Sequence, residues 1–103
     1  MNKNKVLSLI GLATKAGKTV SGEFSTEKAV KNGKAGIVLI AEDASGNTKK
    51  KFENMCRFYE VPCYCLGDRE ILGKAVGKEF RASLAVLDEN FTNAIMEELK
   101  KQL

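Results

Sequence analysis

Gly17, Lys18 and Thr19 are residue types that a nucleotide-binding P-loop uses to hold phosphates. A P-loop has a glycine, four intervening residues and then Gly-Lys-Ser/Thr. Here the preceding glycine is Gly11, which makes the spacing one residue too long. The surrounding pattern also predicts a helix before Gly17 and a strand after it, whereas a P-loop leaves a strand and enters a helix. We therefore expect no nucleotide hydrolysis and interpret Lys18 as a candidate contact to another polyanion.

Other residues with chemical potential give little support for catalysis. The chain contains no histidine, so the commonest general base is missing. Glu42-Asp43 follows a predicted buried strand, where α/β sheets often bind ligands; a strand-end turn with a helix cap is the alternative. Cys56, Cys63 and Cys65 are too few for a zinc site without histidine, and we interpret them as buried thiols. We predict no catalytic residue, no cofactor and no metal site.

The charge of the chain is distributed unevenly. Residues 1–51 hold ten lysines and four acidic residues, or +6, whereas residues 52–103 carry −2 and the whole chain +4. A positive half attracts nucleic acid by displacing counterions, although a solvated surface is the simpler alternative. No apolar run approaches the roughly 20 residues of a membrane span. We expect a cytoplasmic protein with no membrane partner.

The hydrophobic pattern predicts helices and strands in strict alternation. Such alternation implies an α/β fold in which helices cover both faces of one sheet, a three-layer α/β/α sandwich. The length of 103 residues predicts a single domain over 1–103. The expected helices begin near residues 6, 21, 49, 69 and 89, and the expected strands are 18–20, 36–41, 63–66 and 82–87.

The candidate polyanion contacts gather around the start of the second predicted helix. Gly22 opens this helix, whose free amides and positive dipole end favour a phosphate. Lys28 and Lys31 lie one and two turns further, and Lys31 has Glu27 as an alternative ion-pair partner. Phe24 lies beside these basic residues, where its ring suits stacking on a base, with packing against the core as the alternative.

Several motifs resemble the L7Ae/L30e family of ribosomal proteins, with the greatest likeness to its short bacterial members. The motifs are "SGEFSTEKAVKNGKAGIVLIAEDAS" and "VPCYCLGDREILGKAVGKEFRASLAVLDENF", and the likeness extends over most of the chain. Members of this family are small kink-turn RNA-binding proteins. The resemblance implies an α/β/α sandwich with a central mixed four-stranded sheet, structured RNA as partner, ribosomal RNA among the candidates, and a monomer.

The resemblance also implies two RNA-contacting surfaces. In the family, the start of the second helix enters the widened groove of a kinked duplex, and the loop after the Leu-Gly-x-Ala-x-Gly helix closes over an extruded nucleotide. The first surface corresponds to Lys18, Gly22, Glu23, Phe24, Ser25 and Lys28, with Lys31 beside it. The second corresponds to Gly77, Lys78, Glu79, Phe80 and Arg81.

The chain departs from the family pattern at two positions of the first surface. Strong kink-turn binders have an Asn-Glu pair that hydrogen-bonds guanine edges of sheared G·A pairs, and Phe24 and Ser25 stand there in this chain. A phenylalanine ring has no donor, and a serine hydroxyl cannot accept from two guanine donors as a carboxylate does. The sequence therefore predicts RNA binding with altered base readout. A protein–protein adaptor is the main alternative, and a small-ligand site at Glu42-Asp43 is a weaker one.

Overall fold

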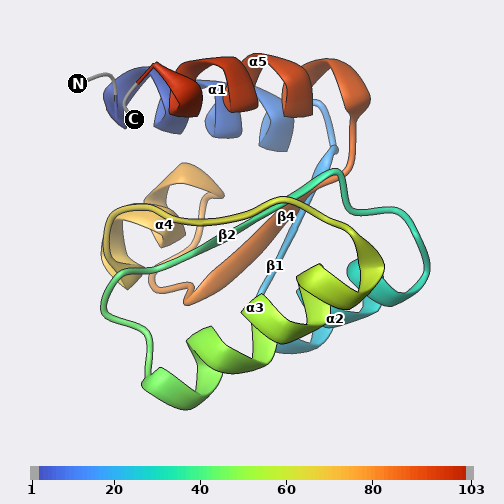
Figure 1. Cartoon of the computed structure of the whole chain (residues 1–103). Coiled ribbons are helices and arrows are strands. Elements are labelled where there is room, and N and C mark those ends of the chain that lie inside the picture. The colour runs from blue at the N-terminus through green and yellow to red at the C-terminus, as the bar shows by residue number, and fades with distance from the viewer. Residues whose placement is uncertain (1–2, 102–103) are drawn as a thin grey trace.

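The computed structural model describes residues 3–101, in which helices and strands alternate as predicted. The strands are short and the helices longer, and the first and last helices lie side by side (Figure 1). In chain order the elements are α1 (Lys3–Lys15), β1 (Thr19–Ser21), α2 (Glu23–Lys31), β2 (Ile37–Ile40), α3 (Gly46–Tyr59), β3 (Cys63–Cys65), α4 (Arg69–Ala75), β4 (Ser83–Val86) and α5 (Glu89–Lys100).

The sheet is mixed and has the strand order β1-β4-β2-β3, which confirms the predicted architecture. The β4 strand runs antiparallel to both β1 and β2, and β2 runs parallel to β3. Helices α1, α4 and α5 pack on one face, and α2 and α3 on the other (Figure 1). The last strand of the chain is therefore a central one, which brings the residues before β4 next to the residues after β1.

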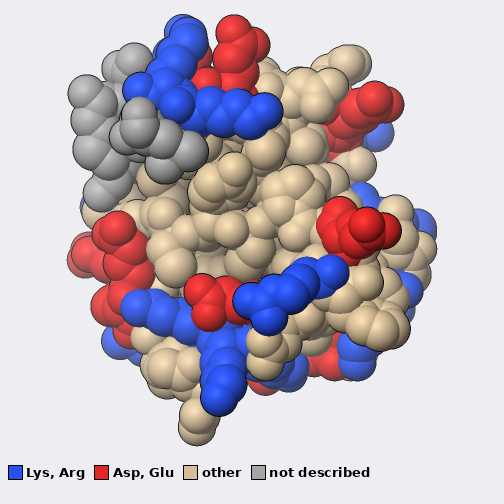
Figure 2. All heavy atoms as spheres, viewed as in Figure 1, with Lys and Arg blue, Asp and Glu red and all other residues tan. Residues whose placement is uncertain are grey.

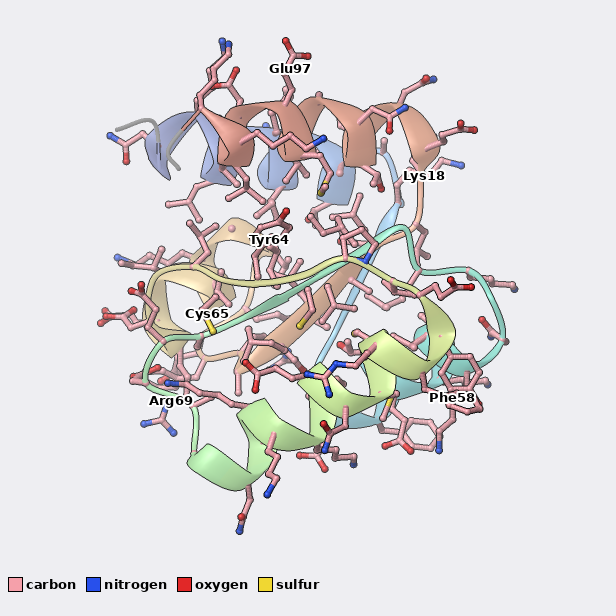
Figure 3. All side chains as sticks on the ribbon, viewed as in Figure 1. Lys18, Phe58, Tyr64, Cys65, Arg69 and Glu97 are labelled. Carbon is pink, nitrogen blue, oxygen red and sulfur yellow. The ribbon has the colours of Figure 1, made fainter. Side chains whose placement is uncertain are left out.

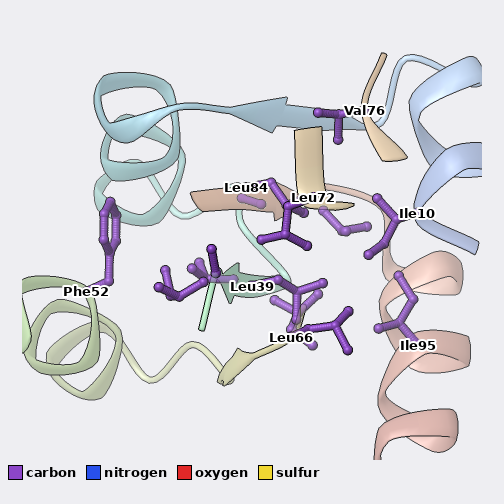
Figure 4. Packing of buried hydrophobic residues seen from close by; sticks show 14 of the residues in the cluster. Ile10, Leu39, Phe52, Leu66, Leu72, Val76, Leu84 and Ile95 are labelled. Carbon is purple, nitrogen blue, oxygen red and sulfur yellow. The ribbon is translucent and has the colours of Figure 1, made fainter. Parts of the chain in front are cut away.

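The core forms around the two central strands. All residues of β2 and of β4 are buried, as expected for strands covered on both faces. Ile10 of α1 and Ile95 of α5 fill one side of the sheet, and Phe52 of α3 fills the other (Figure 4). The unbroken apolar run at residues 36–41 correctly predicted this central position for β2.

The helix starts differ in their capping. Ser45, Asp68 and Asp88 each accept a hydrogen bond from the amide three residues later, at 3.1, 2.8 and 2.8 Å. The N-cap position of α2 is held by Gly22, whose φ is 91°, and Glu23 is the first residue of the helix. Because glycine has no side chain, the first turn of α2 has no side-chain cap.

The interpretation of all three cysteines as buried thiols is wrong for two of them. Cys56 is buried, but Cys63 is only half-buried and Cys65 is exposed, because β3 is an edge strand and one end of it faces solvent (Figure 3). Within residues 3–101 no helix has both the length and the apolar character to cross a membrane.

Candidate nucleic-acid interface

Two segments that are distant in sequence form one surface groove. The start of α2 lies on one side of it, and the residues between α4 and β4 lie on the other. They meet because β1 pairs antiparallel with β4, so the chain leaves one strand where it enters the other. The groove has a volume of about 430 Å³, and we call it the α2 groove. The hydroxyl and basic side chains that line it are those of Thr14, Thr19, Ser21, Ser25, Lys78 and Arg81.

Arg81 connects the two sides of the α2 groove. Its Nε donates a hydrogen bond to Ser21 Oγ at 2.9 Å, and its Nη1 donates to the Phe80 carbonyl at 2.8 Å. The backbone next to it is held as well, because the Gly22 amide donates to the Ser83 carbonyl at 2.9 Å. These bonds fix a planar guanidinium, a group suited to phosphate, at the mouth of the groove.

Close backbone packing positions the loop that follows α4. The amide of Lys78 donates to the Gly73 carbonyl at 2.8 Å, and Gly77 has a φ of 73°, a left-handed conformation that favours glycine. A Cβ on Gly73 would lie 2.5 Å from the carbonyl oxygen of Glu79. Only glycine at this buried helical position lets residues 77–80 pass so close to α4, so Gly73 determines where Lys78 and Phe80 lie.

The outer face of α2 presents an aromatic and a basic side chain next to the groove. Phe24 is 79% exposed, which leaves the packing alternative unsupported. Lys28 is exposed, stands one turn after Phe24 on the same stripe of the helix, and has no ion-pair partner among residues 3–101. Lys31 differs, because its Nζ lies 2.7 Å from Glu27 Oε2 in the ion pair that the sequence offered as an alternative.

Carboxylates on α2 are paired with basic residues of α2 and α3. Lys51 Nζ lies 2.9 Å from Glu23 and 2.8 Å from Glu27. The hydrogen bond from Lys31, followed by that from Lys51, lowers the pKa of Glu27 to about 2. The hydrogen bonds to Glu27 and Glu23 in turn raise the pKa of Lys51 above its ordinary value. Glu27 and Lys51 are therefore both charged at neutral pH.

Lys18 lies apart from the other predicted contacts. It stands at the end of β1 nearer α1 and α5, and its carbonyl accepts from the Leu87 amide at 2.8 Å (Figure 3). Ser21, at the mouth of the groove, is three residues further along the strand, or about 10 Å. The P-loop alternative loses its basis here, because Gly17 ends a helix with a φ of 72° and a strand follows.

The remaining candidates from the sequence are the Glu42-Asp43 pair and the three cysteines. Asp43 Oδ1 accepts from the Arg69 amide at 2.9 Å, so this carboxylate joins the end of β2 to the start of α4. The hydrogen bond with Cys56, together with burial, raises the pKa of the Cys63 thiol, and partial desolvation raises that of Cys65. Within residues 3–101 no three His, Cys, Asp or Glu side chains are placed to hold a metal ion.

Sequence reasoning missed three contributors to this surface. The hydroxyls of Thr14 and Thr19 lie 2.9 Å apart and line the groove, and Thr19 belongs to the Gly17-Lys18-Thr19 run that first suggested a P-loop. Lys51 of α3 was not among the candidate contacts. The antiparallel pairing of β1 with β4 and the packing of α2 on α3 are needed to place them, and neither can be obtained from local sequence patterns.

The face of the molecule shown in Figure 2 carries both basic and acidic side chains. On the face shown in Figure 2, basic and acidic side chains are interspersed over α3 and α5, separated by a band of uncharged side chains. The excess of lysine in the first half of the chain is thus not concentrated on this face. Among residues 3–101, Lys28, Lys78 and Arg81 form no ion pair, and they lie in or beside the α2 groove, next to the uncapped start of α2.

The fold and the groove agree with a known protein family. The sequence matches the Ribosomal protein L7Ae/L30e/S12e/Gadd45 family over residues 4–96, and this chain belongs to that family. Among curated relatives, the RNA-binding protein YlxQ of Bacillus subtilis (strain 168) is 44% identical over 88 residues, 85% of this chain and 88% of the relative. The RNA-binding protein YlxQ of Enterococcus faecium is 41% identical over 96 residues, 93% and 92% of the two chains.

Solved structures have the same architecture. A Bacillus halodurans protein described as having unknown function superposes with a TM-score of 0.89 at 38% identity, over 93% of this chain and 97% of that one. The Giardia lamblia 15.5kD RNA binding protein superposes with a TM-score of 0.85 over 100% of this chain and 92% of its own. At 20% identity the second likeness concerns the fold alone. The short bacterial relatives are of the kind that the sequence motifs indicated.

Proposed function

We propose that this chain is a non-catalytic, ribosome-associated RNA-binding protein of the cytoplasm, acting as a monomeric single domain. Its partner is structured, kink-turn-like RNA, ribosomal RNA among the candidates, which it contacts through the start of α2 and residues 77–81. The observation that carries the proposal is the α2 groove, where an uncapped helix start meets Lys78 and Arg81. Family membership and the names of the bacterial relatives support it.

The first turn of α2 offers the backbone contacts. The Gly22 amide donates to Ser83 and the Thr26 amide to Gly22, and no acceptor is found for the amides of residues 23–25 within residues 3–101. Such amides bind a phosphate oxygen at the positive end of the helix dipole. Arg81 and Lys78 add charge on the other side of the groove, so a bent strand lying along it is held from both sides.

Phe24 supplies the altered base readout in this proposal. Its exposed ring stands beside the groove where kink-turn binders of the family have asparagine, and a ring face stacks on any unpaired base without reading its edge. Ser25 lines the groove and gives one hydroxyl in place of a carboxylate. We expect the chain to bind a kinked RNA with relaxed discrimination of the G·A pairs. Lys18 contacts only an RNA long enough to reach the far end of β1.

Binding measured by fluorescence anisotropy tests the proposal. The probes are a synthetic kink-turn hairpin and a continuous duplex of equal length, each titrated at several salt concentrations. We expect preference for the kinked RNA, and a salt slope that Lys28→Met reduces by about 1. Lys100→Met on α5, across the sheet, is the matched control and leaves affinity unchanged. Absence of binding to either RNA at low salt would overturn the proposal.

A paired substitution tests the readout itself. Phe24→Asn with Ser25→Glu restores the side chains that read sheared G·A pairs in the family. We expect the double variant to bind the kink-turn hairpin at least tenfold more tightly than the natural chain, the value of one good bidentate base contact or more. An unchanged affinity would mean that the departure at these positions does not determine base readout.

The exposed aromatic side chains favour a second candidate, a protein–protein adaptor. Besides Phe24, the Phe58 and Tyr59 rings on α3 are 78% and 41% exposed and pack edge to face with centroids 4.9 Å apart. Exposed aromatic rings are common anchors of protein interfaces. A partner retained from ribonuclease-treated lysate by the natural chain and lost with Phe58→Ala supports the adaptor, whereas loss of every partner on ribonuclease treatment supports RNA binding.

A further inference from the structure

The start of α2 contains two acidic residues, which is unexpected for a surface proposed to bind a polyanion. Glu23 is the first residue of α2, and Glu27 stands one turn later on the same stripe of the helix. This stripe lies next to the one that carries Phe24 and Lys28. Uncompensated, the two carboxylates would repel a phosphate strand approaching Lys28.

Lys51 of α3 forms ion pairs with both residues of this acidic stripe. Its Nζ lies 2.9 Å from Glu23 Oε2 and 2.8 Å from Glu27 Oε1, so one ammonium joins both carboxylates. Lys31 adds a 2.7 Å ion pair to the other oxygen of Glu27. Two acidic and two basic groups thus form a neutral network on the side of α2 that faces α3.

The position of Lys51 is not explained by the stability of its own helix. It is the sixth residue of α3, beyond the first turn in which the helix dipole acts on a charge, so the dipole does not favour a cation there. Its ion pairs are largely exposed, with side-chain accessibilities of 39% for Lys51 and 58% for Glu23, and exposed pairs contribute little to folding. Its contacts reach another helix, 28 residues earlier in the chain. Both partners belong to the helix whose start is the proposed RNA contact.

We propose that Lys51 is a positioning residue for RNA binding, which holds and neutralises the carboxylates of Glu23 and Glu27 and does not itself contact the RNA. This inference rests on the proposed function. Lys51 keeps the acidic stripe directed toward α3, so that Phe24, Lys28 and the α2 groove present an aromatic and basic surface. Electrostatic specificity then depends on a residue outside the contact surface.

Substitution of Lys51 distinguishes this role from a direct phosphate contact. Lys51→Met keeps the alkyl chain and removes the charge, so we expect affinity for the kink-turn hairpin to fall roughly threefold to tenfold at low salt. The loss should shrink as salt rises to about 1 M, where the screening length is only about 3 Å. Lys51→Arg retains both ion pairs and should bind within about twofold of the natural chain.

Removal of a carboxylate is the decisive step. Glu23→Gln in the Lys51→Met background restores the neutral network, so we expect it to return affinity to within about twofold of the natural chain. Lys50→Met is the matched control, because Lys50 is the neighbouring lysine and forms no ion pair within residues 3–101. Adding Glu23→Gln to Lys50→Met should change affinity no more than Glu23→Gln does alone. Glu23→Gln alone should tighten binding, and melting temperatures establish that each variant is folded.

The outcomes separate this inference from the proposed function. If the natural chain binds RNA and Lys51→Met binds it with unchanged affinity, Lys51 has no role in binding. If Lys51→Met lowers affinity and Glu23→Gln does not restore it, Lys51 contacts the RNA directly. Either result overturns the inference while the proposed function stands. If the natural chain binds no structured RNA at low salt, the proposed function fails first and this inference with it.

Discussion

The starts of α2 and α5 show two uses of the same backbone geometry. At α5 the Asp88 carboxylate accepts from the Phe91 amide at 2.8 Å, so the helix start is closed by its own side chain. At α2 the corresponding residue is Gly22, and the amides after it lie open beside Lys78 and Arg81. A capped start stabilises the fold, whereas an uncapped one next to basic groups is available to an anion. The following substitutions test this difference.

Gly73→Ala should have the largest effect, because it disturbs the side of the α2 groove opposite α2. The new Cβ would lie 2.5 Å from the Glu79 carbonyl oxygen, so residues 77–80 must shift. Overpacking of this kind costs about 1–3 kcal/mol. We expect a lower urea midpoint together with weaker RNA binding. Gly46→Ala at the start of α3 is the control, since no atom lies within 4 Å of its Cβ. Equal effects of the two substitutions would contradict the assigned role of Gly73.

Phe24→Ala should weaken RNA binding without affecting the fold. Loss of a base–aromatic stack costs about 1–3 kcal/mol of binding free energy. Because the ring is 79% exposed, the free energy of unfolding should change by less than about 0.5 kcal/mol. Phe58→Ala is a closely matched control, with a ring that is 78% exposed on α3. If both variants lose RNA affinity equally, the aromatic contact is not specific to the start of α2.

Asp88→Ala should lower the stability of the fold and leave RNA affinity unchanged, the reverse of Phe24→Ala. Removal of a helix cap costs about 1 kcal/mol of folding free energy, which denaturant titration measures. Since α5 packs on the face of the sheet opposite α2, RNA affinity should stay unchanged (Figure 1). Asp88→Asn keeps a capping oxygen and should recover most of the stability. A loss of RNA affinity with Asp88→Ala would mean that the two helix starts do not act independently.

Local sequence patterns were sufficient for the fold but not for the electrostatics of the site. The apolar run of β2 and the alternation of helices and strands depend on neighbours in sequence, and the structure has both as predicted. The contacts of Lys51 and Arg81 span 28 and 60 residues, and they exist only because α2 packs on α3 and β1 pairs with β4. Sequence spacing alone does not specify such contacts.

The final helix gives one more example and the smallest expected effect. Glu97 and Lys101 have the i,i+4 spacing of a helical ion pair, but Lys101 Nζ lies 3.1 Å from Glu98, which Lys5 of α1 also approaches at 3.4 Å. The Glu98 side chain is only 6% exposed, so α5 turns this carboxylate toward α1 and leaves Glu97 in solvent (Figure 3). Glu98 therefore pairs with Lys101 at the end of α5 and, through Lys5, also connects α5 to α1.

The pH dependence of stability tests that assignment. The hydrogen bond from Lys101, supported by that from Lys5, lowers the pKa of Glu98 below its ordinary value of 4.5. A carboxyl group with a depressed pKa in the folded state stabilises the fold above the unfolded-state value and loses this contribution as pH falls through the folded-state value. Glu98→Gln should therefore lower the melting temperature at pH 7, and the difference from the natural chain should narrow below about pH 4.5. Glu97→Gln should leave the melting temperature unchanged at pH 7. A lower melting temperature for Glu97→Gln but not for Glu98→Gln would mean that Lys101 pairs with Glu97.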